Sequence, residues 1–246
     1  MLVYDGPSKL DGKAVQVILT GDRALGSSES KNPKTGPVVQ SYILCRHTDP
    51  VSATRSGKDY SICGTCKHTK MARAKAKAAG KTPAAACYVG VQHAPNATWK
   101  SHKGKQVMDL AMLSDKVKQA IQTRGIRFGS YGDPGAVPVK LWRTLAGLVP
   151  NHKRTGFSHQ WRTAPKDLKS LCVASVDTPD EARQAQAHGW RTFRVRQATD
   201  PILPNEITCP ASAEFLGKKT TCQKCGLCNG STGPDDRRKN VVIINH

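Results

Sequence analysis

The sequence predicts an α/β protein with a parallel sheet, either open or curled into a partial (β/α) barrel. Between residues 107 and 196, runs rich in β-branched residues alternate with segments of helical periodicity, as in proteins with parallel sheets. Before this region lies a β-rich segment that contains the first cysteines. After it, residues 209–228 form a cysteine-rich stretch with the spacing of a metal-binding loop.

The N-terminal segment contains two predicted strands, residues 14–19 and 38–45. Both are rich in Val, Ile and Leu, and the Gly-, Ser- and Lys-containing stretch 26–36 between them predicts a loop. The simplest arrangement is an antiparallel pair. We expect residues 1–105, with a basic arm and the first cysteine group, and the α/β region 106–246 to form one compact unit.

The α/β region supplies the alternating elements, which Gly- and Pro-containing turns separate. Asp177 or Thr178 caps the last predicted helix, because Pro179 suits its first position and Gly189 follows its end. In chain order the region contains helical segments 108–113 and 115–121, strand 126–131, helix 139–148, strands 154–158 and 171–176, helix 180–188, and strands 191–196 and 241–244.

The C-terminal cysteines have the strongest metal-binding spacing in the chain. Cys222, Cys225 and Cys228 follow one another at intervals of three, and Cys209 lies thirteen residues upstream. The Cys-x2-Cys-x2-Cys run resembles the loop with which bacterial ferredoxins bind a [4Fe–4S] cluster, which is the metal centre we favour. Zinc accepts the same ligands and is the alternative.

A first cysteine group precedes the α/β region and consists of Cys63, Cys66 and Cys87. Three ligands leave one coordination position open, as a catalytic centre requires, whereas a fourth ligand would close a structural site. Cys45 is a possible fourth ligand, as is a nearby histidine, His47 or His68. The sequence thus predicts one or two [4Fe–4S] clusters, or zinc in their place.

Charge is concentrated in one segment. The net charge is +20, and residues 61–105 contain nine Lys or Arg and no Asp or Glu. Such a field favours a polyanion as partner, DNA before RNA, although a basic run is also compatible with a merely solvated face. The predicted contacts to nucleic acid are Lys67, Lys70, Arg73, Lys75, Lys77, Lys81, Arg194 and Arg196.

No membrane or secretion signal is predicted. The chain has no run of 18 apolar residues, and its first residues lack the basic and apolar regions of a signal peptide. Nine cysteines, mostly in metal-like spacings, indicate a reducing compartment. We therefore expect a cytoplasmic protein.

Three polar residues follow predicted strands. Asp133, His159 and Asp177 come directly after the strands that end near residues 131, 158 and 176. The carboxyl ends of parallel strands meet at one edge of a sheet, so these side chains are expected in one crevice, where they suit acid, base or nucleophilic roles. Individually, Asp133 and Asp177 also fit ordinary turn and cap positions.

Several motifs together resemble an uncharacterised bacteriophage family of cysteine-rich proteins. The similarity extends from about residue 38 to 230 and implies a phage origin, with expression in the host cytoplasm. It also implies that seven cysteines belong to the family pattern, namely 63, 66, 87, 209, 222, 225 and 228, and that Cys45 and Cys172 stand outside it. The motifs are Ile62–Cys66, Cys87–Val89, Ala94-Pro95, Trp99, Gly129–Pro134, Thr155–Trp161, Ala174–Asp177, Cys209–Ser212 and Cys222–Cys228.

More remotely, the strand-end acids and the C-terminal metal loop are similar to the barrel transglycosylases that exchange guanine for 7-deazaguanine in tRNA or DNA. The metal motif of those enzymes and the Cys-x3-Cys-x2-Cys motif of radical-SAM barrels are both missing. The first hypothesis for the function is a phage-type metalloenzyme that modifies a base in DNA or RNA. The alternative is a non-catalytic nucleic-acid-binding protein with structural metal sites, active in replication or transcription control.

Overall fold

A single mixed sheet organises the chain. The computed structural model describes residues 1–245 and places nine strands in the order β1-β2-β3-β4-β5-β6-β7-β9-β8. Their bounds are β1 Leu2–Pro7, β2 Ala14–Thr20, β3 Val39–Cys45, β4 Ile126–Tyr131, β5 Arg154–Ser158, β6 Val173–Val176, β7 Thr192–Arg196, β8 Glu206–Thr208 and β9 Asn240–Ile244. The sheet is open, so the parallel-sheet form of the prediction is confirmed and the partial barrel is not.

Strands from both parts of the chain share this sheet. β2 pairs antiparallel with β1 and with β3, whereas every pair from β3 to β8 is parallel. The register joins Val15 to Cys45 in the predicted N-terminal pair and Ile126 to Arg154 in the parallel region. The final strand, β9, lies between β7 and β8 rather than at the edge.

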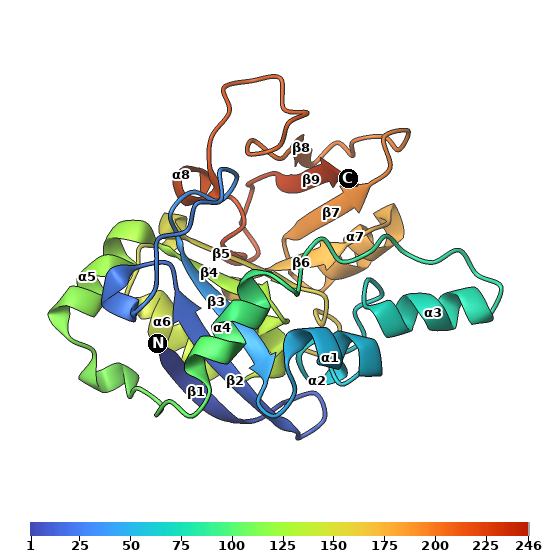
Figure 1. Cartoon of the computed structure of the whole chain (residues 1–246). Coiled ribbons are helices and arrows are strands. Elements are labelled where there is room, and N and C mark those ends of the chain that lie inside the picture. Colours follow the sequence, from blue (N-terminus) through green and yellow to red (C-terminus); the bar gives the residue numbers. More distant parts are fainter. Residues whose placement is uncertain (246) are drawn as a thin grey trace.

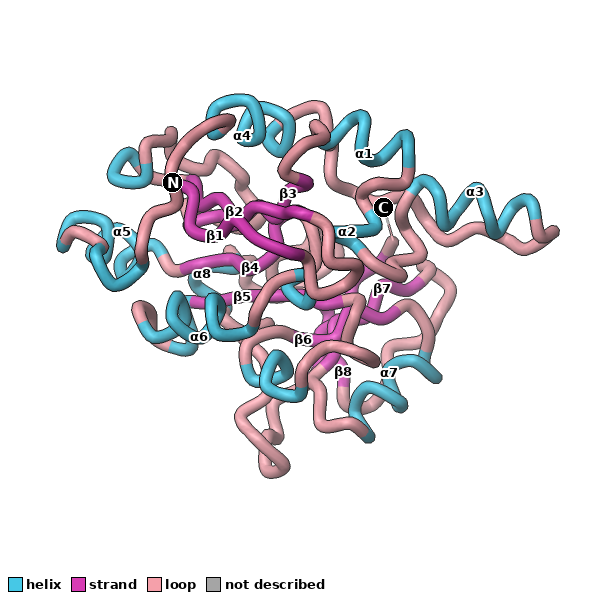
Figure 2. The backbone as a smooth tube through the Cα atoms, turned by 90° about the horizontal axis from the view of Figure 1, so that it is seen from below, coloured by secondary structure: helices cyan, strands magenta, loops and turns pink. Residues whose placement is uncertain are grey.

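Helices cover both faces of the sheet (Figure 1, Figure 2). Seen edge-on, α1, α3 and α4 lie on one side of the strands and α6 and α7 on the other, with α5 beside α6. None of the described helices is long and apolar enough to cross a membrane. The α-helices are α1 Pro50–Ser56, α2 Tyr60–Cys63, α3 Lys70–Ala78, α4 Ala94–His102, α5 Asp115–Arg124, α6 Val139–Gly147, α7 Pro179–Ala187 and α8 Cys222–Cys225.

Short 3-10 helices replace several expected turns and helical segments. They are η1 Arg23–Leu25, η2 Leu110–Met112, η3 Pro134–Ala136, η4 Asn151–Lys153 and η5 Lys166–Ser170. Thr178 is the cap of α7, since its side chain accepts a hydrogen bond from the N–H of Glu181. The connection from β5 to β6 contains only η5, so α-helical cover is thin there.

One continuous hydrophobic core joins the strands to residues of α1, α5, α6 and α7. Phe128 on β4 and Trp142 on α6 are fully buried, with ring centroids 5.2 Å apart. The indole N–H of Trp142 donates to the carbonyl of Pro134 (2.8 Å). This bond anchors η3, and so the turn after β4 that carries Asp133, to the core.

Candidate functional site

The strand-end residues and the first cysteine group lie at the same edge of the sheet. Asp133, His159 and Asp177 follow β4, β5 and β6, which are parallel neighbours. The main-chain N–H of Asp133 donates to the carbonyl of Ile62 (2.6 Å), the residue before Cys63. The structure therefore places α2 and the turn after it over these strand ends.

The Asp133 carboxylate is buried, and both of its oxygens are hydrogen bonded. Oδ1 accepts from the N–H of Gly135 (2.8 Å) and the hydroxyl of Ser158 (2.8 Å). Oδ2 accepts from the N–H groups of His159 (2.6 Å) and Gln160 (3.2 Å). Burial raises the pKa of Asp133 to about 6. The four hydrogen bonds act in the opposite direction, because they favour the ionised form. Asp133 is thus a positioning residue for the loop after β5.

Gln160 fixes the turn between the first two cysteines. Its Nε2 donates to the carbonyl of Cys63 (2.9 Å), and its Oε1 accepts from the hydroxyl of Thr65 (3.1 Å). Gly64 has a φ of 54° and a ψ of −129°. A Cβ there would stand 2.5 Å from Gln160 Oε1, so the close approach of the two loops requires glycine.

His68, two residues after Cys66, pairs with Asp177. Its Nε2 lies 3.1 Å from Asp177 Oδ2, and its Nδ1 lies 2.9 Å from the carbonyl oxygen of Ala85. Both ring nitrogens face acceptors, so only the imidazolium satisfies both, and the bond to Asp177 raises the pKa of His68. Lys67 Nζ is 2.7 Å from the same carboxylate oxygen. Although burial opposes ionisation, His68 and Lys67 together lower the pKa of Asp177.

His159 adjoins this pair and has the opposite protonation state. Its ring centroid is 5.3 Å from that of His68 in an edge-to-face arrangement. Burial and the positive charge of His68 lower the pKa of His159 to about 4, so the ring is neutral at pH 7. Within residues 1–245 no group hydrogen-bonds its ring nitrogens, which leaves one nitrogen able to accept a proton or ligate a metal.

The three thiols of the first cysteine group gather beside these residues. Burial, followed by the neighbouring thiols of Cys66 and Cys87, raises the pKa of Cys63 well above its ordinary value. Cys87 lies on a loop farther along the chain, and its main-chain N–H donates to the carbonyl of His68 (3.2 Å). Cys45, the possible fourth ligand, has its own partner: its thiol donates to the carbonyl of Lys58 (3.3 Å).

The four C-terminal cysteines form a second group. Cys222 and Cys225 belong to the short helix α8, which ends at Gly226 in the left-handed conformation (φ 64°). Burial and then the thiols of Cys209, Cys222 and Cys225 raise the pKa of Cys228 well above its ordinary value. These thiols are thus near enough to influence one another, but two of them lie on a helix, and the metal-binding loop that the spacing predicts is not confirmed.

An arginine–carboxylate network holds this second group against the sheet. Arg191, directly before β7, donates to the carbonyls of Leu227 and Lys239. Arg238 donates to Asn229 Oδ1 (2.5 Å) and to both carboxylate oxygens of Asp236 (2.8 and 2.5 Å). The backbone around Cys228 is thus hydrogen bonded from both sides, a feature that the cysteine spacing did not predict.

Neither cysteine group has the geometry of a bound ion. Within residues 1–245, no group of three or more His, Cys, Asp or Glu side chains is arranged to hold a metal ion. The donor sets nevertheless fit thiophilic metals, since each group offers soft sulfur donors; Cys87 is exposed, Cys209 is buried, and the other five are half-buried. The [4Fe–4S] or zinc occupancy therefore stays a prediction.

One predicted phosphate contact is wrong and others have protein partners. Arg194 is fully buried and forms an ion pair with Glu206 on β8 (2.6 Å), because β9 and β8 extend the sheet beyond β7 and cover it. Arg196 donates to three main-chain carbonyls, including that of Asp200 (2.8 Å). Lys67 pairs with Asp177, as described above.

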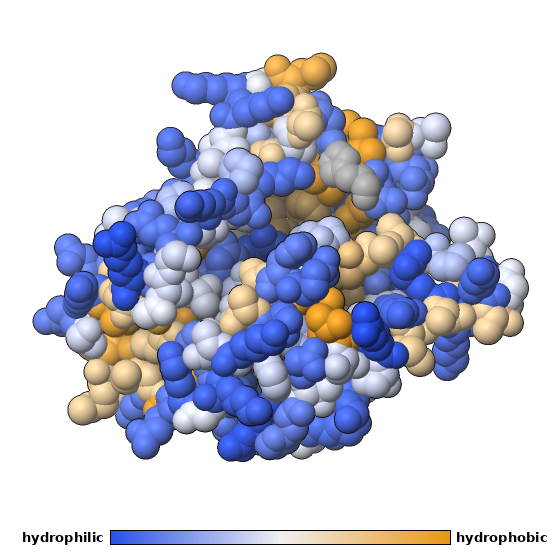
Figure 3. All heavy atoms as spheres, viewed as in Figure 1, coloured by the Kyte–Doolittle hydropathy of each residue, from blue (hydrophilic) through white to orange (hydrophobic). Residues whose placement is uncertain are grey.

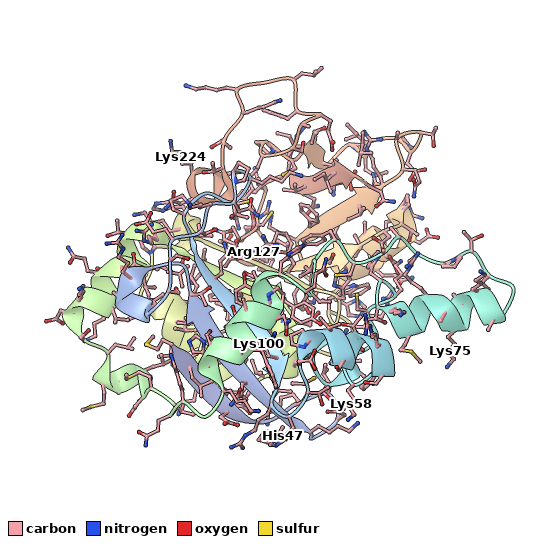
Figure 4. All side chains as sticks on the ribbon, viewed as in Figure 1. His47, Lys58, Lys75, Lys100, Arg127 and Lys224 are labelled. Atoms are coloured by element: carbon pink, nitrogen blue, oxygen red, sulfur yellow. The ribbon has the colours of Figure 1, made fainter. Side chains whose placement is uncertain are left out.

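The remaining basic residues lie on α3 and the loop after it. No residue of α3 is buried, which agrees with its lack of an apolar stripe. Arg73 is half-buried, and its Nε donates to the carbonyl of Ala84 (2.8 Å). The ribbon of α3 stands out from the body of the protein (Figure 1), and Lys75 points away from it (Figure 4). The exposed lysines are Lys70, Lys75, Lys77 and Lys81.

A comparison of the chain with known protein families, with curated proteins and with solved structures finds no match. The resemblance to phage proteins and to transglycosylases therefore stays an expectation.

The role of Asp133 predicts the effect of Asp133→Asn. An amide nitrogen in place of one oxygen would face N–H donors, so the variant is expected to lose about 1–3 kcal/mol of unfolding free energy. The loosened loop should also let a maleimide reach Cys63 and Cys66 faster. Urea unfolding and thiol labelling measure both effects. Asp167→Asn is the matched control, since Asp167 forms an exposed pair with Arg143. Wild-type stability and labelling in Asp133→Asn would contradict this role.

The Asp236 network predicts a pH-dependent loss of stability. Its hydrogen bonds to Arg238 hold the pKa of Asp236 below its ordinary value of 3.8. The ionised carboxylate therefore stabilises the fold fully above about pH 4, and this contribution is lost as pH falls through the lowered pKa. Asp236→Asn should cost about 1–3 kcal/mol at pH 7. In urea unfolding between pH 3 and 7, the gap to wild type should narrow in acid; a constant gap would contradict the assignment.

Proposed function

We propose that this protein is a metalloenzyme that modifies a nucleobase in DNA or RNA. The observation that carries the proposal is that Cys63 and Cys66 lie near Asp133, whose carboxylate holds the loop of the neutral His159, at the carboxyl ends of parallel strands. In open α/β sheets this edge is where reactive groups from several loops meet. The expected phage origin would place the protein in the cytoplasm of the host cell.

The side chains of the site suit different tasks. His159 is uncharged at pH 7 and has free ring nitrogens, so it is the group best able to take a proton from a substrate. His68 and Asp177 form a charged pair beside it, which fixes the neighbouring loop and makes protonation of His159 unfavourable. Asp133 acts through the loop it holds and not on the substrate.

Two metal centres complete the proposal. Cys63, Cys66 and Cys87 would hold a [4Fe–4S] cluster or a zinc ion with one position open. When bound there, an iron centre supplies electron transfer or a binding site for a co-substrate, and zinc supplies an acidified water. Cys209, Cys222, Cys225 and Cys228 would hold a closed centre, whose role is to support the fold.

The test compares the nucleosides of cells that express the wild type with those of cells that express His159→Ala. DNA and RNA are digested and analysed by mass spectrometry, and each protein is purified without oxygen and assayed for iron, labile sulfide and zinc. Cys172→Ala is the control, because Cys172 is buried outside both cysteine groups. Cys63→Ser and Cys225→Ser report on the two centres separately.

We expect a modified nucleoside with the wild type and Cys172→Ala, and its loss with His159→Ala at unchanged metal content. Cys63→Ser should lose both one centre and the product, whereas Cys225→Ser should lose the other centre and cooperative unfolding. Wild-type protein without iron or zinc would refute the metal centres. Metal-loaded protein that yields no modified nucleoside would refute the reaction and leave the alternative below.

A second candidate function is nucleic-acid binding without catalysis, with both metal sites structural. The exposed lysines of α3 and its loop favour it, because they have no carboxylate partner among the described residues and α3 buries nothing. A segment of this kind is suited to follow a phosphate backbone. In this case Asp177→Asn and His159→Ala would leave the nucleosides of the nucleic acid the same as with the wild type.

Substitution of Lys70, Lys75, Lys77 and Lys81 by Gln tests the basic segment. If each lysine neutralises one phosphate, the slope of log affinity against log salt should become less steep by about 0.9 per lysine on duplex DNA. Fluorescence anisotropy with labelled duplex at several salt concentrations measures this slope. Replacement of four exposed lysines elsewhere, Lys9, Lys13, Lys116 and Lys140, controls for net charge. Equal slopes in the two variants would show that α3 is only a solvated face.

A further inference from the structure

A cleft separate from the site above opens on the α4 side of the sheet. Its volume is about 660 Å³, which lies within the range of about 300–1,000 Å³ that is usual for small-molecule sites. Side chains of β3 and β4 form its floor, and α4, the loop after β2 and Tyr88 form its walls. Figure 3 shows this face hollowed at its centre, with hydrophilic side chains to the left of the hollow and more hydrophobic ones to its right.

Arg127 on β4 lines this cleft and has no carboxylate partner. Its Nη2 donates to the hydroxyl of Tyr88 (2.6 Å), while its Nε is buried without a hydrogen-bond acceptor. The guanidinium carbon lies 5.5 Å from the ring centroid of Phe157. Figure 4 shows Arg127 in the middle of the molecule, between α4 and the C-terminal segment. An unsatisfied N–H beside an uncompensated charge is costly, and an anionic ligand would relieve both.

Arg127 shares the lack of a carboxylate partner and the unsatisfied Nε with two other half-buried arginines, Arg154 and Arg196, but of these three only Arg127 lines the cleft. Arg124 pairs with Asp22 and Glu29, and Arg194 pairs with Glu206. For Arg127 the groups that favour its charge are the phenol of Tyr88, the thiol of Cys222 and the phenol of Tyr42. One acid, Glu29, also lines the cleft, but it pairs with Arg124, so the charge of Arg127 has no carboxylate partner there.

The rest of the lining suits a nucleoside. Gln40 is buried, and its Oε1 accepts from the hydroxyl of Ser130 (2.5 Å), which leaves its amide N–H groups as donors beside the cleft. Tyr42 and Tyr88 add aromatic rings on which a base can stack. Tyr88 is 78% exposed although it is aromatic, as is common for a residue whose ring contacts a ligand.

We propose that this cleft binds a nucleotide, with its phosphate on Arg127 and its base against the tyrosines. The nucleotide is either a free monophosphate or one unit of a nucleic-acid strand, since both present the same phosphate, sugar and base. This site requires neither cysteine group to hold a metal, so it stands apart from the proposed reaction.

Isothermal titration calorimetry with the four 5′-deoxynucleoside monophosphates, the matching nucleosides and inorganic phosphate tests the assignment. At least one nucleotide should bind about tenfold or more tightly than its nucleoside, because a charge-assisted phosphate contact is worth about 1.5–3 kcal/mol. Arg127→Gln should bring the nucleotide to the affinity of the nucleoside. Arg143→Gln, on the exposed side of α6, is the matched control and should bind like wild type.

Two further measurements, and a metal assay of Arg127→Gln, keep the result unambiguous. Tyr88→Ala removes an exposed ring without touching the core and should weaken nucleotide and nucleoside alike. Competition by a short single-stranded oligonucleotide would identify a unit of a strand, and its absence a free nucleotide. The proposal fails if nucleotide and nucleoside bind equally, if neither binds, or if Arg127→Gln loses metal but keeps its affinity for nucleotide. That last result would mean that Arg127 only balances the Cys222 thiolate.

Discussion

The buried carboxylate of Asp133 is the interaction on which the arrangement of the site depends. Its four hydrogen bonds join the turn after β4 to the loop after β5, and its main-chain N–H reaches the residue before Cys63. Two segments that lie far apart in the sequence therefore share one buried charge, and a main-chain bond ties the segment before Cys63 to the same turn. Because a buried carboxylate without all of its donors is strongly unfavourable, the turn after β4 and the loop after β5 hold each other in place.

The C-terminal segment is built on a comparable principle with the charges reversed. Arg191 and Arg238 are cations that satisfy main-chain carbonyls around Cys228, and Asp236 balances them. This network joins the second cysteine group to β7, while β9 inserts between β7 and β8. Strand β9 and the cysteines before it are thus fixed together. A metal bound to these cysteines would therefore stabilise this edge of the sheet.

Local patterns predicted most of the strands, the helices α5, α6 and α7, and the placement of Asp133, His159 and Asp177 at neighbouring strand ends. They did not predict partners distant in the chain. The His68–Asp177 pair spans 109 positions, and only the crossing of α2 over the sheet brings its members together. The predicted phosphate contact of Arg194 was wrong for the same reason. Its burial depends on Glu206, which lies on a strand of three residues, too short to show a periodic pattern. Helices α1 and α4 were missed because they are short and polar.

The two cysteine groups lie on opposite sides of one line of polar contacts. Tyr88 directly follows Cys87, its hydroxyl accepts from Arg127, and the charge of Arg127 partly offsets the burial that raises the pKa of Cys222. Arg127 therefore belongs to the cleft and to the surroundings of the second cysteine group at once. A phosphate in the cleft and a thiolate of Cys222 in a metal centre would both be favoured by the charge of this one guanidinium. The proposed ligand and the proposed second centre would thus compete for the same side chain.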